Sequence, residues 1–143
     1  MADAAVIAEY NVALARESEN LALDPAVVRK GVEAVLKDAA KGIYFAAEED
    51  GRLVGQILLT YEWSDWRNGN FWWLQSVYVH PDFRSRGVFK SLYEHALQQA
   101  QSCAEVCGLR LYVETHNTRA LDVYYRLGMK KTDYYMLERV FSR

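Results

Sequence analysis

The sequence predicts an α/β (α+β) fold in a single domain, with a β-sheet covered by helices on both faces. The run from Leu74 to Val79 is rich in β-branched and aromatic residues, with apolar residues on both alternating faces, which is typical of a central strand. His80-Pro81-Asp82 ends this strand, and apolar residues then recur from Val88 to Ala100 with the spacing of a long amphipathic helix. The dipeptides Asp50-Gly51 and Asn68-Gly69 indicate two hairpins that supply further strands.

Two helices are predicted before the first hairpin. The first runs from about Ala4 to Glu17 and has its apolar residues on one stripe. The second begins at Asp24-Pro25, because an aspartate at the N-cap followed by a proline at the first helical position is a strong start signal. The strands Ile43–Ala47 and Leu53–Tyr61 then flank the first hairpin turn.

The remaining elements follow the long helix. We expect Gly108 to cap that helix and Leu109–Thr115 to form another strand. Asn117 opens a short helix that ends at Leu127-Gly128. The sequence then predicts a closing strand region from Met129 to Phe141.

Composition limits the classes of function. The 143 residues are 51% apolar and 25% charged, which suits one globular domain with a full core. The formal net charge of −2 gives no reason to expect a nucleic-acid partner. The sequence contains neither an apolar run of membrane-spanning length nor a signal peptide, so we expect a cytoplasmic protein with no membrane partner. Cys103 and Cys107 are expected to be buried thiols, and no metal site is predicted.

The segment between the central strand and the long helix has the features of an anion site. The first turn of a helix presents unpaired N–H groups and the positive end of the helix dipole. Gly87 lets the backbone approach a ligand closely, while Arg84 and Arg86 add positive charge. A diphosphate would suit this loop, although a plain turn with solvated arginines also fits an isolated R-x-x-G pattern.

All four tryptophans lie between residues 62 and 73. Trp63 and Trp66 stand beside Glu62 and Asp65, so they are candidates to line a pocket for a cationic group, with Glu17 and Glu19 as further acidic residues. A packed lid or a dimer contact explains the exposed aromatic residues equally well.

Two motifs together resemble the GNAT superfamily of acyl-CoA-dependent N-acyltransferases. The first motif is Arg84-Ser85-Arg86-Gly87-Val88-Phe89, and the second is formed at fixed intervals by Asn117, Ala120, Tyr124, Gly128 and Met129. The resemblance implies a mixed, splayed sheet and acetyl-CoA as the co-substrate. It extends over most of the chain, although the short strand with which the family usually begins has no counterpart before the first predicted helix.

The resemblance also implies roles for individual residues. The pantetheine arm of acetyl-CoA would pair with the central strand at Val77, Tyr78 and Val79, and Asn117 would contact the cofactor. The pyrophosphate would lie on the loop formed by Arg84, Ser85, Arg86, Gly87, Val88, Phe89 and Lys90. Tyr124 matches the general acid of the family; its neighbour Tyr125 lacks the matching spacing from Asn117 and Gly128.

The function predicted on this basis is an N-acetyltransferase that acts on a primary amine of a small molecule or a peptide, with a possible homodimer as the assembly. The acidic loop favours a small cationic acceptor. We expect ordered water to take the proton from the amine; Glu62 is the nearest acidic candidate for a general base in the sequence and Asp65 the next. A non-catalytic acyl-CoA-binding regulatory domain is the other reading. A P-loop hydrolase is discounted, because no Lys-Ser/Thr pair follows the glycine.

Overall fold

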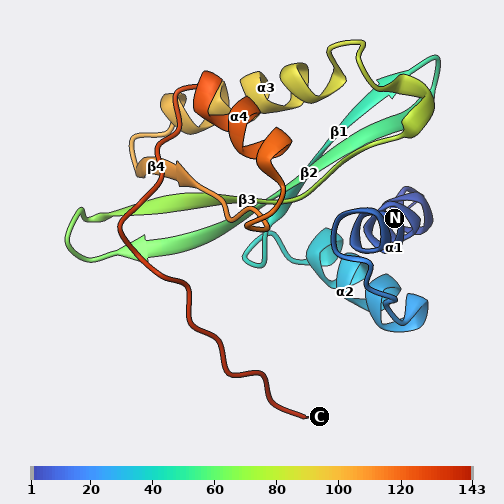
Figure 1. The fold of residues 1–143 in the computed structure, drawn as a ribbon, viewed down its shortest axis with the longest axis horizontal. Helices are drawn as coiled ribbons and strands as arrows, with labels where there is room; N and C mark the ends of the chain where they lie inside the picture. Colours follow the sequence, from blue (N-terminus) through green and yellow to red (C-terminus); the bar gives the residue numbers. More distant parts are fainter. Residues whose placement is uncertain (1, 143) are drawn as a thin grey trace. The chain divides into compact units, whose positions relative to one another are not determined.

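The computed structural model describes residues 2–142, which form a mixed α+β structure (Figure 1). The chain divides into two compact units, Met1–Tyr112 and Val113–Arg143, and each is described by itself. The elements in chain order are α1 (Ala4–Glu19), α2 (Pro25–Lys37), β1 (Ile43–Glu49), β2 (Arg52–Ser64), β3 (Gly69–Val79), η1 (Pro81–Phe83), α3 (Val88–Ser102), β4 (Val106–Arg110) and α4 (Thr118–Arg126).

The first unit contains a sheet with the strand order β1-β2-β3-β4. The two hairpins make β1, β2 and β3 antiparallel neighbours, whereas β4 runs parallel to β3 after the crossover through α3, so the sheet is mixed as predicted. Asp50 and Gly51 both have positive φ, at 52° and 76°, which is the geometry that a tight hairpin turn requires. The sequence therefore placed both hairpins correctly.

Helices cover both faces of this sheet. A Cβ built on Gly55 of β2 would lie 2.8 Å from Cγ1 of Val88, so that face of the strand lies against α3. The next side chain, Gln56, donates a hydrogen bond to Asn11 of α1 over 2.8 Å. Since successive strand residues point to opposite faces, α1 and α3 lie on opposite sides of β2.

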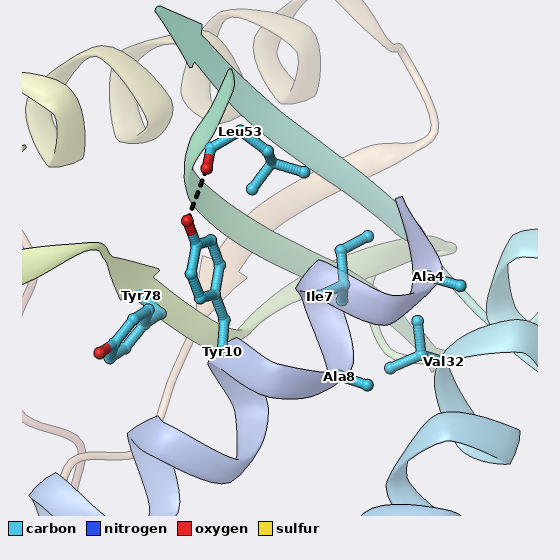
Figure 2. Packing of buried hydrophobic residues seen from close by; sticks show 7 residues of the cluster. All are labelled: Ala4, Ile7, Ala8, Tyr10, Val32, Leu53 and Tyr78. Carbon is cyan, nitrogen blue, oxygen red and sulfur yellow. Dashed lines mark hydrogen bonds between the residues drawn. The ribbon is translucent and has the colours of Figure 1, made fainter. Parts of the chain in front are cut away.

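The main apolar core lies on the α1 side of the sheet. Figure 2 shows its members from α1, α2, β2 and β3: Ala4, Ile7, Ala8, Tyr10, Val32, Leu53 and Tyr78. The Tyr10 hydroxyl donates to the backbone carbonyl of Leu53 over 2.5 Å, which satisfies the one polar atom that this ring carries into the core. Each large apolar side chain contributes about 1.5–3 kcal/mol on full burial, so this cluster fixes α1 on the sheet.

Both predicted helices at the start of the chain are confirmed. The side chain of Asp24 accepts a hydrogen bond from the Ala26 N–H over 2.9 Å, and Pro25 is the first residue of α2. Within α2, Val32 is buried while Leu36 is 36% exposed, because α2 packs mainly on α1 rather than on the sheet.

Two predictions around the last strand of the first unit, the Gly108 cap and the strand bounds Leu109–Thr115, are wrong. The long helix ends at Ser102 with Cys103 as its C-cap, and Gly108 lies inside β4. There a Cβ would lie 2.8 Å from the Phe71 ring, so the glycine is required by the close approach of that ring. The strand itself begins earlier and ends at Arg110.

The expectation of buried thiols is also wrong. Cys107 is exposed and Cys103 is half-buried, and both are free cysteines. The error follows from the position of the strand. Cys103 is the C-cap of α3 and Cys107 lies in β4, so the two residues do not share one buried helical face.

In the second unit α4 forms as predicted. The Asn117 side chain accepts a hydrogen bond from the Ala120 N–H over 3.2 Å, which caps the helix start. At the other end Gly128 has φ 93°, and the Met129 N–H donates to the Tyr124 carbonyl over 3.1 Å. The helix boundaries predicted from the second motif are therefore confirmed.

The predicted closing strand region from Met129 to Phe141 is not a strand in the structure. A strand requires a hydrogen-bonded neighbour, and none pairs with this segment within residues 2–142. Its large apolar side chains are exposed, namely Tyr134, Tyr135, Met136, Leu137, Val140 and Phe141. Among the helices of the described chain, none combines the length and apolar character needed to cross a membrane.

Candidate cofactor site

The loop between β3 and α3 has the backbone geometry of an anion cradle. Ser85 and Gly87 both have positive φ, at 62° and 83°, and the segment from Arg84 to Gly87 is exposed. The first backbone bond of α3 runs from the Ser91 N–H to the Gly87 carbonyl over 3.0 Å, so the helix begins directly after the loop. Alternating left-handed residues before a helix start turn backbone N–H groups toward one concave side.

The backbone conformation at residue 87 favours glycine. A Cβ added there would meet nothing within 4 Å among the described residues, so any side chain would fit sterically. The φ of 83° is the constraint, since residues with a Cβ are strained in that region. The sequence prediction of a special glycine at this position agrees with the backbone.

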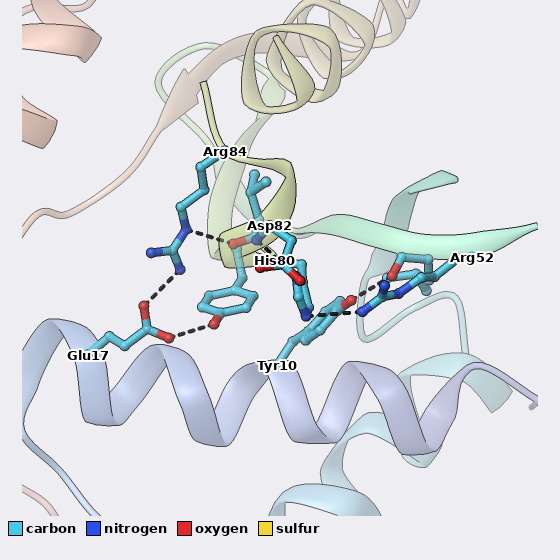
Figure 3. A network of polar contacts seen from close by, with 9 residues as sticks. Tyr10, Glu17, Arg52, His80, Asp82 and Arg84 are labelled. Carbon is cyan, nitrogen blue, oxygen red and sulfur yellow. Dashed lines mark hydrogen bonds and ion pairs between the residues drawn. The ribbon is translucent and has the colours of Figure 1, made fainter. Parts of the chain in front are cut away.

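Both arginines of the loop are bonded to carboxylates. Arg84 donates to Glu17 of α1 over 2.7 Å and, through Nε, to the backbone carbonyl of Val79 over 3.0 Å (Figure 3). Arg86 donates to Glu49 at the end of β1 over 3.0 Å. The two guanidinium groups therefore connect the loop to its neighbours on two sides, in addition to any charge they present to a ligand.

Tyr78 extends this network into the core. Its hydroxyl donates to Oε2 of Glu17 over 2.5 Å, and its ring lies 5.1 Å from that of Tyr10. Burial and the bond to the Glu17 carboxylate raise the pKa of Tyr78 to about 12. The same bond, followed by the contacts with Arg84, lowers the pKa of Glu17, so the cluster holds a neutral phenol and an ionised carboxylate.

A β-bulge interrupts β3 just before Tyr78, and the sequence gave no sign of it. The register passes from the pair Leu58–Gln75 to the pair Gln56–Tyr78, so Ser76 and Val77 together face the single residue Ile57. Ser76 takes φ 49°, which is uncommon for a residue other than glycine. Neither an Asn nor a Gly marks the place, and only the pairing geometry reveals it.

The buried side chain of Gln56 supports this bulge. It is 0% exposed, and its Nε2 donates to the Ser76 carbonyl over 3.2 Å and to Oδ1 of Asn11 over 2.8 Å. Within the described chain its Oε1 has no hydrogen-bond partner. Since a buried amide normally has its groups satisfied, this glutamine marks a polar position under the bulge.

The edge of β3 is open beyond the bulge. Strand β4 pairs with β3 only from Asn70 to Trp73, where Trp73 faces Arg110, the last residue of β4. From Leu74 to Val79 the strand therefore continues past the end of its parallel neighbour. This is the splayed arrangement that the sequence motifs imply, and an extended ligand can pair with such an edge as an added strand.

The predicted acidic and aromatic pocket is not assembled in the first unit. Glu62 accepts hydrogen bonds from Nε1 of Trp73 over 2.9 Å and from Arg110 over 2.8 Å, and these bonds lower its pKa. Glu17 is bonded at Tyr78, five residues further along β3, or roughly 16 Å at the usual rise of a strand. Trp63 and Trp66 at the hairpin tip are 58% and 85% exposed.

The second motif lies in the second unit, and two of its residues have predicted roles. Asn117 uses its side-chain oxygen to cap α4, and Tyr124 lies in the last turn of that helix. The backbone carbonyl of Tyr124 accepts bonds from the N–H groups of Leu127 and Met129, both over 3.1 Å. The helix and its glycine terminus thus hold the Tyr124 backbone in a defined position within this unit.

Known proteins are similar to this chain in fold and sequence. Solved structures match almost the full length: a possible acetyltransferase from Clostridium difficile 630 is 43% identical with a TM-score of 0.94, covering 100% of this chain and 94% of that one. A ribosomal-protein-alanine N-acetyltransferase from Brucella melitensis biovar Abortus 2308 is 20% identical with a TM-score of 0.74, covering 97% and 93%, and shows the fold alone.

Curated relatives match over shorter stretches. A thialysine N-epsilon-acetyltransferase from Bos taurus is 32% identical over 53% of this chain and 44% of its own length. The peptidyl-lysine N-acetyltransferase YjaB from Salmonella typhimurium is 32% identical over 63% of this chain and 51% of its own length. The matches thus span about half the length of these relatives. The model of the acetyltransferase (GNAT) family matches residues 10–129, and the chain belongs to that family.

Proposed function

We propose that residues 1–143 act as one N-acetyltransferase domain that transfers an acetyl group from acetyl-CoA to a primary amine of a small molecule or a peptide. The observation that supports this most is the combination, in one unit, of an open β3 edge and a left-handed loop at the start of α3. An extended pantetheine arm requires the first and a pyrophosphate requires the second. The names of the relatives support transfer to an amine.

We place the co-substrate as follows. The pantetheine arm pairs with the backbone of Val77, Tyr78 and Val79. The pyrophosphate binds the amides of the loop and first helical turn, with Ser85, Val88, Phe89 and Lys90 beside Gly87 and the two arginines. Asn117 is proposed as a further cofactor contact. The bulge at Ser76 supports this arrangement, because it leaves two residues of β3 opposite one residue of β2 and so frees backbone groups from the ladder.

The amine nitrogen attacks the carbonyl carbon of the thioester and forms a tetrahedral intermediate. A backbone N–H near Val77 stabilises the negative oxygen. The C–S bond then breaks, and the departing thiolate takes a proton. We propose that Tyr124 donates it, because a phenol with a pKa near 10 is protonated at neutral pH while a thiol has a pKa of about 8.5.

The base that deprotonates the attacking amine is proposed to be an ordered water chain. Glu62 is a poor candidate, since hydrogen bonds from Trp73 and Arg110 stabilise its carboxylate and lower its pKa. Asp65 is exposed at the hairpin tip. Because Glu17 and Glu62 already have cationic partners, the preference for a small cationic acceptor now depends on Asp65 and Glu19 alone.

We also propose an assembly and a cellular location for the protein. We propose a homodimer in which a second copy covers the exposed apolar side chains of the carboxy-terminal segment, because six large apolar residues between Tyr134 and Phe141 are more than an isolated surface usually exposes. A cytoplasmic location fits the free cysteines. Light scattering at two protein concentrations tests the dimer, and a monomer at both contradicts it.

Two measurements on the full chain test the function. Calorimetry with CoA reports binding, and release of free CoA from acetyl-CoA, with and without a panel of amines that includes lysine, lysyl peptides, polyamines and amino sugars, reports turnover. We expect binding together with amine-dependent release. Binding without release across the panel would favour a regulatory acyl-CoA-binding domain, and no binding would contradict both functions.

A further inference from the structure

The Glu17 carboxylate joins three parts of the first unit. It lies in the last turns of α1 and bonds to Tyr78 at the end of β3 over 2.5 Å and to Arg84 at the start of the loop over 2.7 Å. Figure 3 shows the two bonds reaching the two oxygens of one carboxylate. Helix α1, the open end of β3 and the cofactor loop are thus held by a single side chain that lies 67 residues before Arg84 in the sequence.

The guanidinium of Arg84 contacts three neighbouring groups. One terminal nitrogen donates to Glu17, Nε donates to the Val79 carbonyl over 3.0 Å, and the group lies 5.3 Å from the centre of the Tyr78 ring. The Val79 carbonyl belongs to the last residue of β3, immediately before the loop. Arg84 therefore fixes the angle at which the chain leaves the strand, and Glu17 fixes Arg84.

The charges of the loop lead to the same interpretation. Arg84 is paired with Glu17, and Arg86 is paired with Glu49 over 3.0 Å. A guanidinium that already faces a carboxylate adds little net charge for a phosphate, so the backbone amides become the main ligands of an anion here. The arginines act mainly through the shape that they impose on the loop.

We propose that Glu17 is a positioning residue for the cofactor loop, acting through Arg84 to hold the loop at the open end of β3 in its binding conformation. This inference rests on the proposed use of acetyl-CoA. It reassigns Glu17 from a contributor to acceptor charge to a determinant of co-substrate affinity. The proposal also predicts in which direction CoA affinity changes when the Glu17 charge is removed. If Arg84 instead bound a phosphate directly, the affinity would change in the opposite direction.

The discriminating variant is Glu17→Gln, with Glu33→Gln as the matched control. Glu33 also accepts an arginine, Arg29, over 2.6 Å, but both residues lie on α2. If Arg84 is a direct phosphate ligand restrained by Glu17, removing the carboxylate charge frees the guanidinium and tightens CoA binding. If Glu17 positions the loop, the same change weakens binding by about three- to tenfold, in the range expected for losing one partly exposed ion pair with its hydrogen bond.

We expect Glu17→Gln to raise the Kd of CoA and the KM of acetyl-CoA together, with kcat at saturation and the KM of the amine within about twofold of the wild type. Glu33→Gln should leave all four unchanged. A Kd that is unchanged or lower in Glu17→Gln overturns the proposal. A merely structural role is separated by Tm and by the amine, because partial unfolding would lower Tm and raise the apparent KM of the amine together with that of acetyl-CoA.

A double-mutant cycle provides a second readout. If Glu17 acts through Arg84, the pair Glu17→Ala and Arg84→Ala should weaken CoA binding no more than Arg84→Ala alone, because both changes release the same link. Additive losses would show two independent roles and overturn the proposal. The proposed function fails differently: in that case the wild-type protein itself binds no CoA, whereas here wild-type binding is the reference.

Discussion

The two ends of β3 carry clusters of the same chemical make-up. At the open end Glu17 accepts bonds from the Tyr78 hydroxyl and from Arg84. At the paired end Glu62 accepts bonds from the indole N–H of Trp73 and from Arg110. In each case one carboxylate receives an aromatic donor on β3 and an arginine from a different segment. In each case the pKa of the carboxyl group is lowered, with the aromatic donor as the largest cause.

The surroundings of the two clusters differ, and this separates their roles. Arg110 is the last residue of β4 and lies in register with Trp73, so the Glu62 cluster closes a ladder of paired strands. Arg84 starts a loop beside a strand edge that has no partner from β4. We therefore expect the Glu62 cluster to stabilise the sheet and the Glu17 cluster to shape the proposed cofactor loop. The context of a buried or partly buried ion pair, rather than its composition, decides what its loss changes.

The largest expected effect tests the proposed proton donor, without which the cofactor loop would bind CoA but support little turnover. Replacing Tyr124 by Phe removes the proposed proton donor while leaving the ring and its helix. We expect kcat to fall by ~10²-fold or more, with the Kd of CoA near that of the wild type. Tyr125→Phe, in the same helix, is the control and should keep full turnover. An unchanged rate in Tyr124→Phe would show that the thiolate leaves without this phenol.

The next largest effect tests whether the backbone conformation of the loop determines CoA affinity. Gly87→Ala introduces a Cβ where there is space but where φ is 83°. The strain of about 1–2 kcal/mol favours a changed loop, and we expect CoA to bind roughly tenfold more weakly. Calorimetry measures the change. Gly51→Ala, at φ 76° in the β1–β2 turn, is the matched control for strain and should lower Tm without altering the Kd of CoA. Equal affinities for wild type and Gly87→Ala would contradict the cradle.

A smaller effect is expected when the carboxylate charge is removed from each cluster in turn. Glu62→Gln should lower Tm by about 2–4 °C, from roughly 0.5–1 kcal/mol of lost ion pair and hydrogen bond, with no change in the KM of acetyl-CoA. Glu17→Gln should raise the KM of acetyl-CoA and lower Tm by less than Glu62→Gln does. Thermal melts and initial rates on the two variants form a two-by-two comparison. If Glu62→Gln abolishes turnover instead, Glu62 is the general base after all and the distinction between the two ends is lost.

The smallest effect is the pH dependence of the open end. The folded-state pKa of Glu17 lies below the ordinary value of 4.5, so its ionisation stabilises the fold fully above that value, and this stabilisation is lost as the pH falls through the lowered pKa. The difference in Tm between wild type and Glu17→Gln should therefore be constant from pH 6 to 8 and shrink below about pH 4.5. Because the Glu17 side chain is 42% exposed, solvent screening keeps this difference small. A difference that grows on acidification would contradict the ionised assignment.

Local signals in the sequence predicted most of the elements that position the site. Asp24-Pro25, Asp50-Gly51 and Asn117 mark their caps and turns through side-chain or backbone preferences that act within a few residues. The loop was predicted for the same reason, since Gly87 and the helical pattern after it are adjacent. Features that depend on residues within a few positions of one another can therefore be predicted from the sequence.

Features that depend on distant partners could not be read in this way. The partners of Arg84 and Arg86 lie 67 and 37 residues away, so their role in shaping the loop appears only when the fold brings Glu17 and Glu49 to them. Gly108 was assigned to a helix end because glycine favours such ends, whereas the Phe71 ring is what requires it. The segment after Met129 has strand-like composition but no neighbour with which to pair in the described chain.

The extra residue in β3 has a consequence for which changes this protein can tolerate. Gln75 and Tyr78 are three apart, so in a regular strand they would point to opposite faces, yet their partners Leu58 and Gln56 lie on the same face of β2. Because of the bulge, the side chains of Gln75 and Tyr78 point to the same face of the sheet, and Tyr78 contacts Tyr10 and Glu17. Deleting Ser76 would leave Gln75 and Tyr78 two apart in a regular ladder, so the phenol would keep its direction while the bulge, and the backbone groups that it frees beside the loop, would be lost.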